Sequence, residues 1–172
     1  MANFLEDDAI RLRAPEPEDL DALFAIENDE SLWTVSCNNA PYSRRQLSEY
    51  IGNSVHDLFA EHQIRFIIEL DGHVAGCVDL TDVDAVQSHA QVGIAVLSGF
   101  RGKGIAGRAL TLLCGYAAHR LRLHQLVALI PSGNSASLEL FSHAGFKLAG
   151  ELKEWLWACD KFENVRILQK IL

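Results

Sequence analysis

One stretch constrains the chain more than any other, "VGIAVLSGFRGKGIAGRAL", which runs from Val92 to Leu110. An apolar run leads into three glycines, Gly102, Gly104 and Gly107, and apolar residues at helical spacing follow. Glycine permits positive φ and a close backbone approach, and a helix that starts after such a loop points free amide groups into it. That arrangement binds phosphate. By composition alone, the loop fits a phosphate cradle and a plain turn between two buried elements equally well.

Two common phosphate motifs do not account for this loop. The Walker A pattern GxxxxGK[ST] is absent. The spacing of Gly102, Gly104 and Gly107 does fit GxGxxG, but the loop follows an antiparallel meander, and no acidic residue ends a matching second strand. A dinucleotide-binding oxidoreductase is therefore the weaker interpretation.

The order of the predicted elements indicates an α+β fold in a single domain over residues 1–172, because no repeat or Pro/Ser-rich linker divides the chain. Asp71 and Gly72 predict a hairpin turn, and the strand, helix and strand of 91–130 predict one parallel crossover. The final segment predicts two strands joined by "ACDKFE". The other predicted strands are 9–13, 63–70, 73–80, 88–96 and 124–130, and the predicted helices begin at Pro17, Arg44, the glycine loop and Asn134.

Composition narrows the class of protein. The acidic N-terminus "MANFLEDDAI" has no hydrophobic signal core, and no apolar run reaches membrane-spanning length, so we expect a cytoplasmic protein without membrane contact. A formal charge of −8 disfavours nucleic acid and is compatible with a small cationic partner. No metal site is expected, because the four cysteines are far apart and form no CxxC pair: Cys37, Cys77, Cys114 and Cys159.

The glycine loop also carries a resemblance. The run from Arg101 to Ala106 matches [Gln/Arg]-x-x-Gly-x-[Gly/Ala], and "NSASLELFSHAGF" matches Asn-x-x-[Ala/Ser]-x-x-[Leu/Phe]-[Tyr/Phe]-x-x-x-Gly-Phe. With "IRLRAPEPEDL" near the start, the chain resembles the GNAT family of N-acetyltransferases over nearly its whole length. Its tail is similar to the branch of ribosomal-protein N-terminal and spermidine acetyltransferases. The resemblance implies a mixed, largely antiparallel sheet of six to seven strands, flanked by helices on both faces.

The resemblance implies acetyl-CoA as co-substrate, with its pyrophosphate on the loop amides and its pantetheine arm beside the preceding strand. A backbone N–H of Ala95 or Val96 would polarise the thioester carbonyl. Asn134 would bond the arm where two parallel strands splay, and it also fits a helix N-cap. The implied coenzyme-binding residues are Ile94, Ala95, Val96, Arg101, Gly102, Lys103, Gly104, Ile105, Ala106, Gly107, Asn134, Phe141 and Ser142.

The resemblance implies direct transfer in a ternary complex, and two departures affect the proton path. Phe141 stands where many relatives place a tyrosine acid, and it cannot donate a proton. Gln91 stands where many carry a glutamate base, and it can only orient a water. His89 shares the face of Gln91 by strand alternation, but it also fits an exposed strand end. Water, or one of the carboxylates Glu69, Asp79 and Asp82, remains open as acid and base.

The acceptor is expected to be a primary amine, either a polyamine such as spermidine or a protein N-terminus. A non-catalytic acyl-CoA-binding module is the alternative of a different class. The candidate acceptor-binding residues are Glu27, Glu30, Trp33, Tyr42 and Trp155, and further carboxylates and a tryptophan near this face are Asp29, Glu49, Glu151, Glu154 and Trp157. The sequence leaves open whether the chain forms a homo-oligomer.

Overall fold

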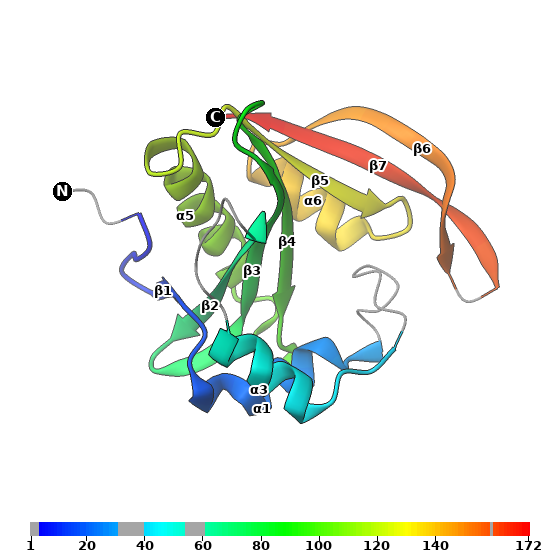
Figure 1. The fold of residues 1–172 in the computed structure, drawn as a ribbon. Coiled ribbons are helices and arrows are strands. Elements are labelled where there is room, and N and C mark those ends of the chain that lie inside the picture. The colour runs from blue at the N-terminus through cyan, green and yellow to red at the C-terminus, as the bar shows by residue number, and fades with distance from the viewer. Residues whose placement is uncertain (1–3, 31–39, 54–60, 159) are drawn as a thin grey trace.

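The computed structural model describes residues 4–30, 40–53, 61–158 and 160–172. They form a seven-stranded sheet of order β1-β2-β3-β4-β5-β7-β6 with helices on both faces (Figure 1). The strands are β1 (Ile10–Arg13), β2 (Ile64–Leu70), β3 (His73–Asp84), β4 (His89–Val96), β5 (Gln125–Pro131), β6 (Lys147–Ala158) and β7 (Lys161–Ile171). The helices are η1 (Pro17–Asp19), α1 (Leu20–Glu27), α3 (Arg44–Asn53), η2 (Ser98–Phe100), α5 (Ile105–His119) and α6 (Ser135–His143).

The first four strands form the antiparallel part of the sheet, with β1 beside β2 and the meander β2, β3 and β4 following. The predicted hairpin turn is confirmed: Asp71 and Gly72 both have positive φ, at 51° and 78°. Two consecutive positive φ values suit the right-handed twist of the flanking strands. The α+β class and the seven strands therefore agree with the prediction.

The predicted parallel crossover is β4, α5 and β5, and the two strands pair over only three residues. The pairs are His89 with Gln125, Ala90 with Leu126, and Gln91 with Val127. Beyond Gln91, β4 stays paired with β3 as far as Val96, while β5 stays paired with β7 as far as Pro131. The two strands therefore diverge, and a gap opens between neighbouring members of the sheet.

Alternation along the strands divides the buried residues between two layers. Ile68 of β2 belongs to a large core that includes Leu110 and Leu113 of α5. Its neighbour Ile67 is equally buried, lies outside that core and points to the opposite face. On that face α1 and α3 bury apolar residues of their own, and Leu23 of α1 is fully buried. Among the described residues, no helix combines the length and hydropathy needed to cross a membrane.

Some predicted boundaries differ from the structure. The helix after the glycine loop begins at Ile105 instead of near Lys103, because Gly104 has a φ of 75° and stands before the first helical residue. The last two strands extend to Ala158 and from Lys161, which shortens the predicted joint "ACDKFE". Trp157 and Phe162 pair edge to face across this hairpin at 4.9 Å, which favours extended backbone close to the turn.

Candidate active site

The glycine loop has the backbone geometry of an anion site. Gly102 and Gly104 both have a φ of 75°, and a Cβ at either position would meet nothing within 4 Å among the residues that the structure describes. The helix α5 starts directly after Gly104, so the amides of its first turn have no partner within the helix. Those amides and the helix dipole favour a bound anion.

The two cationic side chains of the loop donate hydrogen bonds to nearby backbone carbonyls. Arg101 donates from Nε to the carbonyl of Val96 at 2.8 Å, and a second nitrogen lies 3.5 Å from Asp29. Lys103 donates to the carbonyl of Gly99 at 3.0 Å and stands over the ring of Phe100. Because both side chains hold backbone of the same region, the backbone amides are left as the principal anion ligands.

Gly107, the third glycine, lies inside α5 with space around it. A Cβ at this position would meet nothing within 4 Å. Packing against the described part of the chain therefore does not require glycine here. Open space beside the first turn of the helix is what a bound coenzyme would need.

A cavity of about 630 Å³ occupies the gap between β4 and β5 and extends across the sheet toward α1 and α3. From β4 it is lined by Gln91 and the residues Val92 to Ala95, and from β5 by Ala128 to Pro131. Asn134, Ser137 and Phe141 close it from α6. Three segments far apart in the sequence thus meet at one site. The second predicted motif, which begins at Asn134, contributes to its wall, whereas the glycine loop that follows β4 is outside the lining.

The three predicted residues of α6 have different environments. Asn134 accepts the backbone N–H of Ser137 at 3.0 Å, so the predicted N-cap is confirmed, and the residue also lines the cavity. Phe141 is 3% exposed and packs edge to face on Phe146 at 5.0 Å, which makes it part of the core and of the cavity wall. Ser142 is exposed and lies outside the cavity lining, because adjacent helical residues point in different directions.

The structure separates the candidate bases. Gln91 lines the cavity at the last pair before the two strands diverge, whereas His89 lies two residues earlier and does not line it. Asp82 is exposed, and Glu69 accepts a hydrogen bond from Arg13 in a different network. Of the three carboxylates considered for proton transfer, only Asp79 lines the cavity.

Asp79 belongs to an ion cluster that the sequence analysis missed. Arg65 of β2 donates to both carboxylate oxygens of Asp79, at 2.9 and 2.8 Å, and to Glu27 of α1 at 2.5 Å. Burial alone lowers the pKa of Arg65, but the two carboxylates outweigh it and hold that pKa well above its ordinary value. One sequence signal was available, because Arg65 is a charged residue within the otherwise apolar strand "IRFIIEL".

Two further residues of the cavity wall bear on its chemistry. The ring of Tyr50 lies 5.7 Å from the guanidinium carbon of Arg65, and burial raises the pKa of this tyrosine. Burial also raises the pKa of the Cys77 thiol, which therefore lines the cavity as a neutral group. A neutral thiol is a poor nucleophile.

The cavity gathers some of the predicted acceptor residues and not others. Glu27, Tyr42 and Trp155 line it, and Asn28 fixes Tyr42 through two hydrogen bonds to its backbone, at 2.8 and 3.1 Å. Glu30 is exposed and does not line it, and Trp33 lies outside the described residues. The remaining surface candidates, Asp29, Glu49, Glu151, Glu154 and Trp157, are also absent from the lining. Within the described ranges, no group of three or more His, Cys, Asp or Glu residues could hold a metal ion.

Known proteins resemble this chain in sequence and in fold. The chain is 27% identical over 156 residues to spermidine N(1)-acetyltransferase of Escherichia coli strain K12, which covers 91% of this chain and 82% of that protein. It is 28% identical over 135 residues to a putative ribosomal N-acetyltransferase of Bacillus subtilis strain 168, covering 78% and 68%. The fold matches the crystal structure of spermidine N-acetyltransferase from Vibrio cholerae in complex with CoA and spermine, with a TM-score of 0.87, 23% identity and 96% of each chain covered. The acetyltransferase (GNAT) domain model matches residues 9–147, and the chain therefore belongs to the GNAT family of acetyltransferases.

Proposed function

We propose that this acetyltransferase moves the acetyl group of acetyl-CoA directly to a primary amine in a ternary complex, and that the acceptor is a polyamine such as spermidine. The observation that carries the proposal is the cavity, which joins the diverging strands β4 and β5 to the partly buried carboxylates of Glu27 and Asp79. One end of the cavity suits a thioester, and the other suits a cation.

The backbone of β4 supports the coenzyme half of the proposal. Leu97 donates its amide to Ala75 of β3, and the carbonyl of Ala95 faces Gly76 of the same strand. Since backbone groups alternate in direction along a strand, the amide of Val96 faces the gap on the other side. Val96, rather than Ala95, is therefore the donor that we assign to the thioester carbonyl. The pantetheine arm would lie in the gap as an added strand.

The acceptor half rests on charge and on the relatives. Glu27 and Asp79 place negative charge beside the cavity, and Tyr42 and Trp155 add aromatic surface suited to an alkylammonium group. The likeness to the Escherichia coli spermidine acetyltransferase favours a polyamine. The likeness to the Bacillus subtilis protein keeps a protein N-terminus as a second candidate.

Proton transfer in this scheme uses water. Gln91 lines the cavity where the strands diverge and can orient a water molecule beside the attacking amine. Phe141 has no proton to give, and a thiolate leaves without a strong acid because its conjugate pKa is moderate. The cavity residues thus orient the reacting groups and supply charge, and water carries the proton.

The test is thiol release from acetyl-CoA with a panel of spermidine, spermine, simple monoamines and peptides with free N-termini. We expect spermidine to be turned over with a higher kcat/KM than the peptides. Gly104→Trp should abolish turnover, because its side chain would fill the open cradle of the loop. The control is Phe141→Leu, which we expect to retain turnover; alanine is unsuitable because this side chain is almost fully buried.

Three results would contradict the proposal. Acetyl-CoA binding without thiol release on any amine or peptide would identify a binding module that does not catalyse transfer. Thermal protection by a nicotinamide dinucleotide, where CoA gives none, would favour an oxidoreductase. A peptide turned over faster than spermidine would replace the polyamine by a protein N-terminus.

A further inference from the structure

We propose that Arg65 determines which acceptors this enzyme uses, because it fixes the charge of the cluster that receives an ammonium group. The cluster consists of Arg65, Asp79 and Glu27, and the inference rests on the proposed amine acetylation. In this scheme the cluster binds the ammonium group that neighbours the reacting amine. Arg65 limits the cluster to binding one such positive charge.

The geometry makes the three side chains a single unit. Arg65 and Asp79 are directly paired across β2 and β3, and the guanidinium binds both oxygens of Asp79 while a third nitrogen binds Glu27. Arg65 is 19% exposed, Asp79 18% and Glu27 12%. One positive and two negative charges leave the unit with a net charge of −1, in a place that is largely screened from water.

The unit remains open to a ligand. All three residues line the cavity, and the residue opposite Asp79 on β4 is Gly93. A Cβ at Gly93 would stand 3.9 Å from the Cβ of Asp79, so any larger side chain there would cover this flank. The ring of Tyr50 lies near the guanidinium and also borders the same cavity. Each carboxylate oxygen has two lone pairs, so an ammonium can bind oxygens that already accept from Arg65.

The net charge sets how many ammonium groups this unit can hold. The attacking amine must be neutral to react, so the cluster acts on the next ammonium along the acceptor. A net charge of −1 balances one such group. Removing the guanidinium would leave two partly buried carboxylates, which a more highly charged acceptor would neutralise better. Removing one carboxylate would leave a neutral pair with little attraction for any ammonium.

The experiment compares butylamine, 1,4-diaminobutane and spermidine as acceptors by kcat/KM. In the natural enzyme, 1,4-diaminobutane should exceed butylamine. Glu27→Gln, which makes the cluster neutral, should reduce that ratio about tenfold, as one charge at short range in a medium of intermediate polarity predicts. Arg65→Gln, which makes the cluster −2, should raise the ratio of spermidine to 1,4-diaminobutane about tenfold.

The double variant Glu27→Gln with Arg65→Gln restores a net charge of −1. We expect its acceptor ratios to return toward those of the natural enzyme, whereas two purely structural defects would accumulate. Glu49→Gln is the matched control, because Glu49 pairs with Arg45 on the exposed face of α3 and does not line the cavity. Unchanged ratios in both single variants, or a double variant worse than either, would overturn the role of Arg65.

The outcome also distinguishes the two proposals. If no amine releases thiol in the natural enzyme, the proposed function fails, and calorimetric binding of the same three amines to the CoA-loaded protein replaces turnover as the readout. Binding preferences that follow the cluster charge would then support the inference on their own. Preferences that ignore both substitutions would reject it, whatever reaction the enzyme performs.

Discussion

Gly76 lies on β3 opposite Val96, next to the pair Cys77 and Ala95, which lines the cavity. A Cβ at this glycine would stand 2.1 Å from the carbonyl oxygen of Ala95 and 2.9 Å from the Cα of Val96. Both are backbone atoms, which cannot rotate away as a flexible side chain can. The absence of a side chain at Gly76 therefore allows β4 to approach at the residues that we assign to the thioester.

Gly76→Ala should displace the end of β4 and lower the free energy of unfolding by about 2–3 kcal/mol, the cost of overpacking a tight site. The KM for acetyl-CoA should rise, because the amide of Val96 moves with the strand. Gly52→Ala is the control: it lies in α3, where a Cβ would meet no described atom within 4 Å, and we expect stabilisation of about 0.5–1 kcal/mol. Urea unfolding measures the change in the free energy of unfolding, and initial rates measure the KM for acetyl-CoA. A Gly76→Ala protein with neither quantity changed would contradict the close approach of β4 to Gly76.

Asn134 is the N-cap of α6 and is also proposed to bind the coenzyme arm, and substitution can separate the two roles. Its side-chain oxygen caps α6, and its NH2 group is the donor available for the coenzyme arm. Asn134→Ala should cost about 1 kcal/mol of stability and raise the KM for acetyl-CoA. Asn134→Asp keeps the capping oxygen and removes the donor, so the unfolding midpoint should hold while the KM still rises. An unchanged KM in the aspartate variant would leave Asn134 as a cap alone.

At the residue scale, the sequence predicts what depends on local conformation and misses what depends on distant partners. Gly102 and Gly104 are predictable because a tight loop before a helix needs positive φ, which both adopt. The requirement at Gly76 is imposed by β4, about twenty residues later. The role of Arg65 depends on its register with Asp79 and on the position of Glu27, and neither is visible in the sequence of β2.

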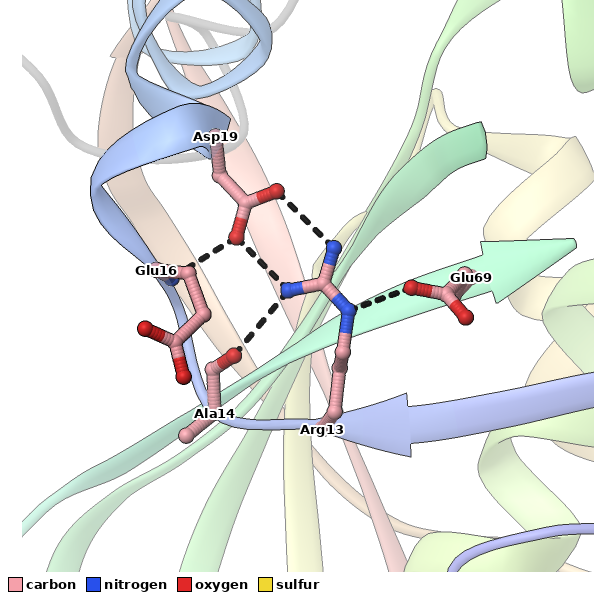
Figure 2. A network of polar contacts seen from close by, with 5 residues as sticks. All are labelled: Arg13, Ala14, Glu16, Asp19 and Glu69. Carbon is pink, nitrogen blue, oxygen red and sulfur yellow. Dashed lines mark hydrogen bonds and ion pairs between the residues drawn. The ribbon is translucent and has the colours of Figure 1, made fainter. Parts of the chain in front are cut away.

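At the element scale, one arginine joins β1, η1 and β2. Figure 2 shows Arg13, at the end of β1, bound to Asp19 of η1 at 2.7 and 2.9 Å and to Glu69 of β2 at 2.5 Å. Asp19 is 4% exposed and also accepts the amide of Glu16 at 2.8 Å. This network fixes where η1 leaves the sheet, and hence where α1 brings Glu27 to the cavity.

Asp19 therefore predicts a pH dependence of stability. Burial raises the pKa of Asp19, but the hydrogen bonds from Arg13 and from the amide of Glu16 outweigh burial and hold that pKa below its ordinary value. The resulting stabilisation is complete above the unfolded-state pKa and is lost as the pH falls through the lower folded-state pKa. Asp19→Asn should cost about 2 kcal/mol at neutral pH, and this cost should shrink as the pH falls below the unfolded-state pKa.

Urea unfolding at neutral pH and at a pH below the ordinary aspartate pKa measures this difference. Asp21→Asn is the matched control, because Asp21 is 84% exposed and its ion pair with Arg44 is on the surface. We expect almost no change from that substitution. A cost at Asp19 that is the same at both pH values would show that its charge contributes nothing.

The elements themselves were largely predictable. Period-two patterns and the turn at Asp71 and Gly72 give the meander, and the apolar strand before α6 gives β5. The ends of β6 and β7 were predicted less well, because the contact of Trp157 with Phe162 extends the hairpin beyond what the turn residues indicate. The divergence of β4 from β5 was implied only by the family resemblance. It depends on β4 continuing along β3 while β5 continues along β7, and neither strand's own residue pattern shows this.

At the scale of the whole molecule, the net charge of −8 adds a field that reaches beyond the cavity. Such a field raises the local concentration of a cationic acceptor, and salt screens it over a distance of about 10 Å at 0.1 M ionic strength. This long-range attraction is separate from the contribution of the Arg65 cluster, because partial burial limits how far salt screens the charges of the cluster. Long-range attraction acts on capture of the acceptor, and the cluster acts on its position.

The kcat/KM for spermidine should therefore fall several-fold as potassium chloride is raised from about 10 mM to about 300 mM, with kcat nearly constant. An aromatic amine that is uncharged at the assay pH should show little salt dependence. Glu27→Gln should lower kcat/KM at every salt concentration but leave the slope against salt nearly unchanged, because one of many charges is removed. An equal slope for the uncharged amine would place the salt effect on the coenzyme or on stability instead. A Glu27→Gln protein that loses the slope would show that the cluster, and not the molecular charge, captures the acceptor.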